Sequence, residues 1–237
     1  MIVFVKVDEN DTNQYLRYVT WSPSGNAIAY VDFNNNLHYR HSAESGDIQL
    51  TKTGLDGVVY NGIPDWVSEE EVFEDNKALW WSPDGSKLVY GVFNDTLVDS
   101  VSLTRYSGCQ IFLCHAKYFS VFLTRYGSWS SQKSDKQGYP FLQYPVQETI
   151  KYPKSGRTNP TVELWVADVG VPTNSQKIPQ YRLKPPSSAV QESNDVSADF
   201  HFTSVTWRDN QTAAVIWMNR LQNVVIISVC SISDKTR

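Results

Sequence analysis

The chain has 237 residues, of which 13% are aromatic and 19% charged, and its formal net charge is −4. A chain of this length can bury a core in one or two domains, and the aromatic content favours strands over helices. The acidic balance and the scattered basic residues give no indication of a nucleic-acid partner. No apolar run reaches the roughly 20 residues of a membrane-spanning helix, and there is no glycine-rich phosphate loop. We therefore expect no membrane span and no cofactor.

Residues 1–8, with the sequence MIVFVKVD, predict an edge strand. Their apolar stretch is too short for a secretory signal, and it lacks a basic region before it and a small-residue cleavage site after it. We therefore expect the chain to begin inside a domain.

A hairpin pattern recurs along the chain. VTWSPSG at 19–25 leads into the apolar run 27–31, WWSPDG at 80–85 leads into 87–91, and the degenerate VTWRDN at 205–210 leads into 213–217. Pro presets the turn in the first two copies, and Gly, Asp or Asn tolerates the unusual dihedral angles of such turns. Recurrence at about 40–60 residues is typical of propeller blades. Spacing alone leaves a β-sandwich with similar hairpins equally open.

An acidic run at 65–73, DWVSEEEVF, follows the turn signal NGIP. It predicts a short helical turn with Asp65 as N-cap, acidic residues in its first turn and large apolar residues on both sides that pull it against a core. A solvated acidic turn is one interpretation. The other is a grip for a cation such as a free peptide N-terminus, whose pKa is about 7.7–8.0.

A second, local repeat lies at 100–106 and 120–126, where SVSLTRY recurs as SVFLTRY. The stretch near 107–126 therefore indicates a local duplication, a retained intron or a gene-model error. Its Cys109, Cys114 and His115 are too few and too weakly spaced to predict a metal site. His38 and His41 are expected on a strand surface, so no metal is predicted.

Three sequons for N-glycosylation begin at Asn10, Asn94 and Asn210, whereas Asn159 is excluded because Pro160 follows it. The chain has three cysteines, an odd number, so at least one has no partner within it.

Several longer motifs, in this order, resemble the β-propeller of the dipeptidyl peptidase IV family. They lie at 61–73, 78–83, 93–96, 152–156, 159–162 and 205–207. The resemblance covers nearly the whole chain except the stretch near 107–126. It implies an all-β fold: an incomplete β-propeller, roughly half of an eight-bladed one, with four-stranded antiparallel blades and a short helical turn that carries the Glu motif.

The same resemblance implies the role of the acidic run. The family consists of serine peptidases that release N-terminal dipeptides, usually after Pro or Ala, and Glu70 and Glu71 match the pair that binds the protonated N-terminus of the peptide substrate. Two carboxylates can satisfy the three donors of an ammonium group and cancel its charge. We expect Glu69 to face solvent or an arginine. The family's substrate-contacting arginine falls near Asp11 here, and Ser68 replaces a usual Tyr.

The resemblance also implies a domain organisation. Residues 1–237 are expected to be a partial N-terminal propeller, with 97–153 as an extended arm that contributes to homodimerisation. The α/β-hydrolase domain with its Ser, Asp and His is expected to be absent, because the chain contains no G-x-S-x-G elbow. The chain alone is therefore expected to be inactive, and whether the full-length protein is an enzyme depends on that elbow. The alternative is a non-catalytic relative whose propeller binds other proteins, such as one that modulates ion channels.

Family members are type II membrane proteins of the cell surface or secreted proteins, which with the sequons indicates the secretory pathway. Cys230 matches a family cysteine whose disulfide partner would lie slightly beyond Arg237.

Overall fold

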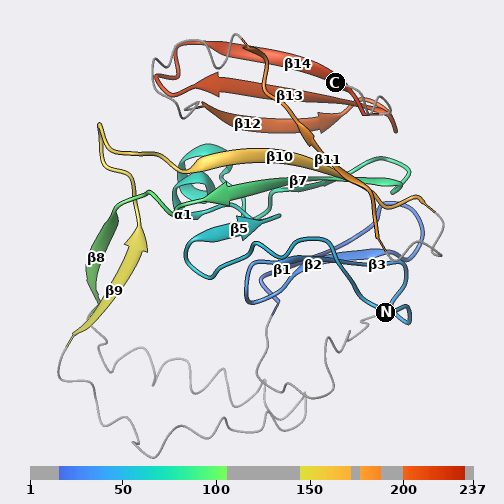
Figure 1. Ribbon diagram of the computed structural model, residues 1–237, viewed down its shortest axis with the longest axis horizontal. Coiled ribbons are helices and arrows are strands. Elements are labelled where there is room, and N and C mark those ends of the chain that lie inside the picture. Colours follow the sequence, from blue (N-terminus) through green and yellow to red (C-terminus); the bar gives the residue numbers. More distant parts are fainter. Residues whose placement is uncertain (1–15, 106–144, 172–176, 188–199, 233–237) are drawn as a thin grey trace, which may run out of the picture. The chain divides into compact units, whose positions relative to one another are not determined.

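The computed structural model describes residues 16–105, 145–171, 177–187 and 200–232. These residues form β-strands apart from one short helical segment (Figure 1), which confirms the all-β prediction. The chain divides into two compact units, one made of Met1–Asp99 with Lys151–Arg237 and the other of Ser100–Ile150.

The first sheet contains four antiparallel strands in chain order. They are β1 (Tyr18–Trp21), β2 (Ile28–Val31), β3 (Leu37–Arg40) and β4 (Ile48–Gln49). The predicted hairpin joins β1 to β2, with Trp21 opposite Ile28. Its turn closes where the Ser22 N–H donates to the Ala27 carbonyl at 2.9 Å, and Gly25 there has a φ of 77°. Glycine tolerates that left-handed conformation without steric cost.

The second sheet runs in the order β11-β10-β7-β5, with β6 also paired to β7. Its strands are β5 (Val59–Asn61), β6 (Leu79–Trp81), β7 (Lys87–Asn94), β10 (Thr161–Asp168) and β11 (Gln180–Leu183). The predicted hairpin joins β6 to β7, and Asp84 fixes its turn by accepting from the Ser86 N–H at 3.0 Å. β7 is apolar along most of its length because it is central and faces packed neighbours on both sides.

The third sheet is a three-stranded meander of β12 (Phe200–Trp207), β13 (Thr212–Asn219) and β14 (Val225–Ser231). The degenerate hairpin joins β12 to β13, with a register shift between Phe202 and Ser204. The first sheet thus has the predicted four strands, whereas the second has five and the third has three described strands.

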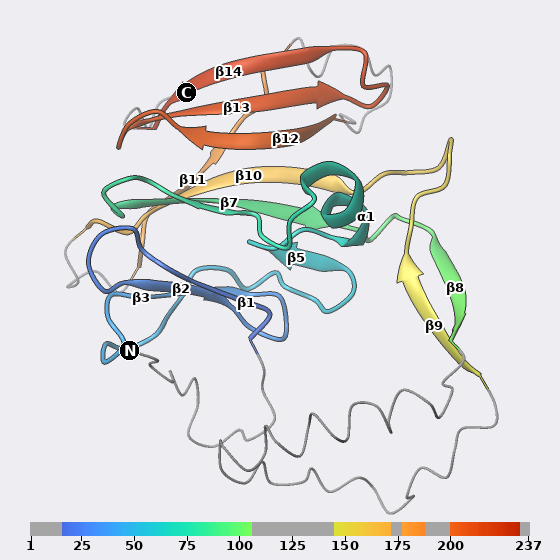
Figure 2. The same ribbon diagram turned by 180° about the vertical axis from the view of Figure 1, so that it is seen from behind.

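Within the larger unit the three sheets lie in layers, with the second between the other two (Figures 1 and 2). One core contains Phe93, Phe202 and Trp217 and joins the second sheet to the third. The other contains Leu37 and Leu88 and joins the first sheet to the second. Successive residues of β7 alternate between these two cores, as the twofold period of a strand requires.

The helical segment lies between β5 and β6. It consists of α1 (Trp66–Ser68), which continues as a π-helical turn, η1 (Glu69–Phe73). No helix in the described ranges is long and apolar enough to cross a membrane.

The smaller unit contains the two-stranded ribbon of β8 (Ser100–Arg105) and β9 (Val146–Lys151). The Gln147 amide donates to the Thr104 hydroxyl at 2.9 Å across this ribbon. The duplicated stretch near 107–126 with its two cysteines lies outside the described residues, and the arm assigned to 97–153 stays a prediction.

Candidate functional site

The acidic run is held out from the second sheet on a closed stem. The Gly62 N–H donates to the Gly91 carbonyl at 2.8 Å, and the Ala78 N–H donates to the Gly62 carbonyl at 2.9 Å. Gly62 has a φ of 78°, which glycine adopts without strain. The segment between Gly62 and Ala78, called the Glu turn here, therefore leaves and re-enters the sheet at one place.

Phe73 fixes the far end of the Glu turn in the core. Its ring lies 5.5 Å from that of Phe202, 5.9 Å from Phe93 and 6.1 Å from Trp80, centroid to centroid. Such tilted and edge-on aromatic contacts add to the burial of the ring itself. The helical segment η1 then ends at Glu74, whose φ of 52° is left-handed. The turn is thus attached to both the second and the third sheet.

Trp66 does not take part in that core, contrary to the expectation that the flanking apolar residues are all buried. Its side chain is 41% exposed, and its ring packs edge-on against Tyr152 at 5.4 Å. Trp66 and Phe73 lie at opposite ends of a short helical segment, so only one of the two reaches the core. An exposed indole beside the acidic residues provides an apolar surface to a ligand.

The three consecutive glutamates differ in exposure. Glu70 and Glu71 are exposed, whereas Glu69 is half-buried, and its expected orientation toward solvent or an arginine stays a prediction. Burial raises the pKa of the Glu69 carboxyl, and the charges of Glu70, Asp65 and Asp75 raise it further. None of the three glutamate side chains forms an ion pair with another residue of the described ranges. The turn therefore carries uncompensated negative charge.

Asp65 occupies the N-cap position, but its side chain does not cap the helix. It has a φ of −72° and a ψ of 172°, and its carbonyl accepts from the Glu69 N–H at 2.9 Å. Its carboxylate is fully buried, and neither oxygen has a partner of hydrogen-bonding geometry among the described residues. Burial raises the pKa of Asp65, while the hydroxyl and N–H of Ser68, which face the carboxylate, oppose the rise.

Asp95, which the sequence analysis did not single out, is the second buried carboxylate near the Glu turn. The residue is 1% exposed, and neither oxygen of its carboxylate has a hydrogen-bond partner among the described residues. Burial and the charge of Asp65 raise its pKa to about 8, against the opposing charge of Lys151. The same two carboxylates, after burial, raise the pKa of Tyr60 to about 12. A signal was present, since Asp95 follows the apolar strand that ends at Asn94.

The predicted glycosylation sites differ in their surroundings. Asn94 is exposed at the end of β7, and its Oδ1 accepts from the Thr96 N–H at 2.9 Å and from the Thr96 hydroxyl at 2.5 Å. Asn210 is exposed in the turn between β12 and β13, where its Oδ1 accepts from the Asp84 N–H at 3.1 Å. Asn10 lies outside the described residues, as does Asp11 at the expected arginine position.

Cys230 lies half-buried on β14, against the core between the second and third sheets. Its thiol forms no disulfide with any residue that the structure describes, and burial raises its pKa.

The surface position expected for His38 can also be compared with the structure. His38 was expected on a strand surface, but its side chain is only 13% exposed, with the carboxylates of Asp47 and Asp32 at 2.7 Å and 3.2 Å from its ring nitrogens. No group of three or more metal-ligating side chains occurs among the described residues.

Stacked antiparallel sheets, each containing one of the recurring hairpins, have the architecture of successive propeller blades. The family model described as the dipeptidyl peptidase IV (DPP IV) N-terminal region matches residues 4–237, and the chain belongs to this family.

Its relatives include both active and inactive proteins by name. The chain is 33% identical over 220 residues to dipeptidyl peptidase 4 of Sus scrofa, which covers 93% of the chain and 24% of that protein. It is 31% identical over 215 residues to inactive dipeptidyl peptidase 10 of Rattus norvegicus, covering 91% and 21%. The crystal structure of Porphyromonas gingivalis dipeptidyl peptidase 4 has the same fold, with a TM-score of 0.62 at 23% identity over 91% of this chain and 24% of that one. The chain thus spans about a quarter of these proteins.

Proposed function

We propose that this chain is the substrate-binding propeller portion of a dipeptidyl-peptidase-IV-like serine exopeptidase, in which Glu70 and Glu71 anchor the N-terminus of a peptide. One observation carries the proposal. Both carboxylates are exposed on a turn whose ends are fixed to two sheets, and neither has a cationic partner among the described residues.

The two carboxylates match a peptide N-terminus in charge and in hydrogen-bonding groups. An ammonium group brings three donors and one positive charge, and two adjacent carboxylates match both. After burial, the charge of Glu70 raises the pKa of the neighbouring Glu69, and this crowding of carboxylates further favours a cation. A peptide extended at its N-terminus would place a neutral amide at the same position and lose this charge pairing. The pair therefore selects for a free N-terminus and sets the distance from it to the bond that is cut.

The test uses the full-length protein and a chromogenic Gly-Pro or Ala-Pro substrate. Glu70→Gln and Glu71→Gln keep the side-chain shape and remove one charge, so we expect kcat/KM to fall by the equivalent of about 2–5 kcal/mol for each. Glu74→Gln is the matched control. Glu74 is also exposed, but it lies at the C-terminal end of η1 and is not part of the proposed pair. The N-acetylated substrate should be cleaved poorly by all variants.

Two outcomes would contradict the proposal in different ways. Wild-type kcat/KM in both glutamine variants would remove the anchoring role of the pair. A correctly folded full-length protein that cleaves no dipeptide substrate would favour a non-catalytic, protein-binding relative, in line with the similarity to an inactive family member. The 237-residue chain on its own is expected to cleave neither substrate.

We further propose that the protein passes through the secretory pathway, to the cell surface or the medium, and that Asn94 and Asn210 carry N-glycans there. Both amides are exposed, and the Thr96 hydroxyl lies against the Asn94 side chain as the acceptor sequence requires. A mass decrease on glycosidase treatment of the protein from a eukaryotic host tests this. The arm at 97–153 is proposed to support a homodimer, and light scattering of the full-length protein with and without it tests that role.

A further inference from the structure

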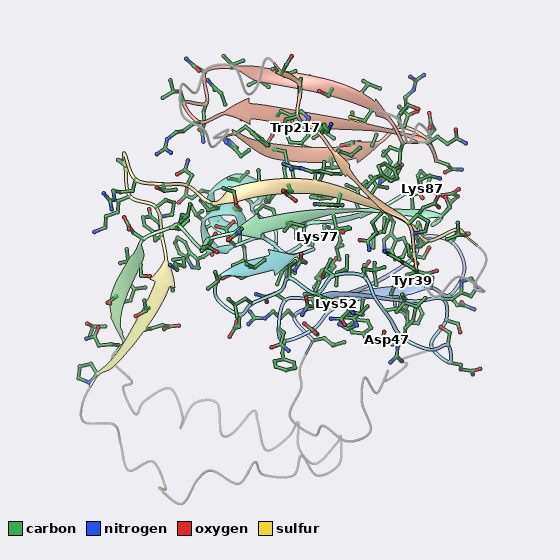
Figure 3. All side chains as sticks on the ribbon, viewed as in Figure 1. Tyr39, Asp47, Lys52, Lys77, Lys87 and Trp217 are labelled. Atoms are coloured by element: carbon green, nitrogen blue, oxygen red, sulfur yellow. The ribbon has the colours of Figure 1, made fainter. Side chains whose placement is uncertain are left out.

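A groove of about 450 Å³ lies between the first and second sheets of the larger unit. One wall is the segment that follows β4, including Lys52, which Figure 3 labels. The other wall is a face of the second sheet that includes Tyr90, Asn94, Thr161 and Trp165. This volume is within the range of about 300–1,000 Å³ that holds small ligands.

Asn94 lies on the wall of this groove and is also the acceptor residue of a sequon. Strand register places Asn94 directly opposite Thr161 on one side and Val59 on the other, and all three line the groove. Asn94 Oδ1 accepts hydrogen bonds from the N–H and the hydroxyl of Thr96. Asn94 Nδ2 donates no hydrogen bond to a residue in the described part of the chain. A substituent on Asn94 therefore begins at the wall of the groove.

The chemistry of the walls suits an uncharged, hydroxyl-rich ligand. The carboxylate of Glu163 is already paired with Arg182 at 3.0 Å and accepts from the Trp165 indole at 2.8 Å. Tyr90 donates to Gln180 at 2.5 Å, and Gln180 donates to the Leu50 carbonyl at 2.9 Å, so one polar network already joins the two sheets.

What remains for a ligand is a set of neutral groups and one cation. The Thr161 hydroxyl can exchange hydrogen bonds with sugar hydroxyls, and the half-buried Trp165 ring provides an apolar face for a sugar ring. From Asn94 to Tyr90 the strand extends for roughly 14 Å, at about 3.4 Å per residue. That length suits the first sugars of a glycan.

We propose that the N-glycan carried by Asn94 packs its first N-acetylglucosamine residues into this groove and so bridges the first and second sheets. The inference rests on the secretory-pathway part of the proposed function. In the attachment step Nδ2 displaces a lipid-linked pyrophosphate from C1 of the first sugar. One C–N bond forms, one C–O bond breaks, the amide loses one proton, and the lipid pyrophosphate leaves with the electron pair.

The experiment uses the full-length protein from a eukaryotic host and glycopeptide mass spectrometry. A packed glycan is shielded from the trimming enzymes, so we expect Asn94 to keep mainly oligomannose chains while the Asn210 chains are processed. Thr161→Arg fills the groove opposite Asn94, and the processed fraction at Asn94 should then rise several-fold. Thr206→Arg is the matched control, since Thr206 is an exposed strand threonine of the third sheet. It should leave the Asn94 pattern unchanged.

Stability gives a second measurement that does not depend on glycan processing. Removing the glycans enzymatically should lower the Tm of the wild type more than that of Asn94→Gln, which never carries this glycan. An unoccupied Asn94 would overturn the inference, as would an Asn94 glycan processed equally in the wild type and in Thr161→Arg. Dipeptide cleavage is assayed on the same samples. An active enzyme with a fully processed Asn94 glycan would overturn this inference alone, and an inactive protein with a protected glycan would overturn the peptidase proposal alone.

Discussion

The second and third sheets are built on the same hairpin but bury different numbers of faces. β7 of the second sheet contributes side chains to both cores of the larger unit. β13 of the third sheet alternates buried with half-buried residues, and on β14 the side chains of Val225, Ile227 and Val229 are 56%, 67% and 64% exposed. Both strands are strongly apolar. Apolar content therefore indicates a blade, but the presence of a neighbouring sheet decides which faces of the blade are buried.

The largest expected effect comes from truncating the face that the two sheets share. Trp217 is fully buried on β13 and contacts Phe200 and Phe202, so Trp217→Ala should cost about 3–5 kcal/mol of unfolding free energy. Ile227→Ala on the exposed face should cost under about 0.5 kcal/mol, as surface substitutions usually do. Denaturant unfolding of the 237-residue chain measures the unfolding free energy of both variants. Equal losses in the two variants would contradict the difference between the shared face and the exposed face.

The same pair of variants sharpens the comparison in a longer protein. If a further sheet packs on β14 there, Ile227→Ala should cost about 2–5 kcal/mol, in the range of a buried truncation. A cost that stays near zero in the full-length protein would show that this face remains uncovered.

Phe73→Ala tests whether the Glu turn depends on the contact between the two sheets. The ring is only partly buried, so we expect a loss of about 2–4 kcal/mol in stability, below that of Trp217→Ala. Because backbone hydrogen bonds also hold the turn at Gly62 and Ala78, the fold should survive while the peptidase activity proposed for the full-length protein falls in kcat/KM. Trp21→Ala is the control, since it removes an exposed aromatic of the first sheet, away from the Glu turn. Unchanged kcat/KM in Phe73→Ala would show that the function of the Glu turn does not depend on the packing of Phe73 in the core.

The first sheet gives a third comparison, because His38 on β3 lies among charged side chains and not beside exposed apolar ones. His38 stacks on Tyr30 at 4.9 Å and lies between Asp32 and Asp47. Burial by itself lowers the pKa of His38, but the carboxylates of Asp47 and Asp32 outweigh it and raise the pKa above its ordinary value of 6.5.

The sign of the resulting pH dependence follows from that raised pKa. A protonated His38 stabilises the fold fully below about pH 6.5, and this contribution is lost as the pH rises through the raised folded-state value. The unfolding free energy of the wild type relative to His38→Gln should therefore fall between pH 6 and the alkaline side of that value. A difference that does not change with pH would exclude a charged His38. This is the smallest of the expected effects.

Local patterns predicted the blades well, because a Pro or Gly turn between apolar runs determines a hairpin from a few adjacent residues. The hairpins at 19–31, 80–91 and 205–217 and the helical turn at 65–73 were all predicted in this way. The details of the candidate site were not. Which end of the Glu turn is buried depends on Phe202 and Tyr152, which are far away in the chain. The burial of Asp95 and the half-buried position of Glu69 likewise depend on contacts with distant segments.

The closed stem at Gly62 and Ala78 has a consequence for how such a protein changes over time. Backbone hydrogen bonds next to Gly91 hold both ends of the Glu turn, and backbone groups do not depend on which side chains the turn carries. The side chains of the Glu turn that would contact a ligand can therefore be substituted while the second sheet keeps its structure. Glu70 and Glu71 could be exchanged for another ligand-binding set at little cost to the fold. A lineage with this architecture can lose one binding specificity and acquire another without passing through an unfolded intermediate.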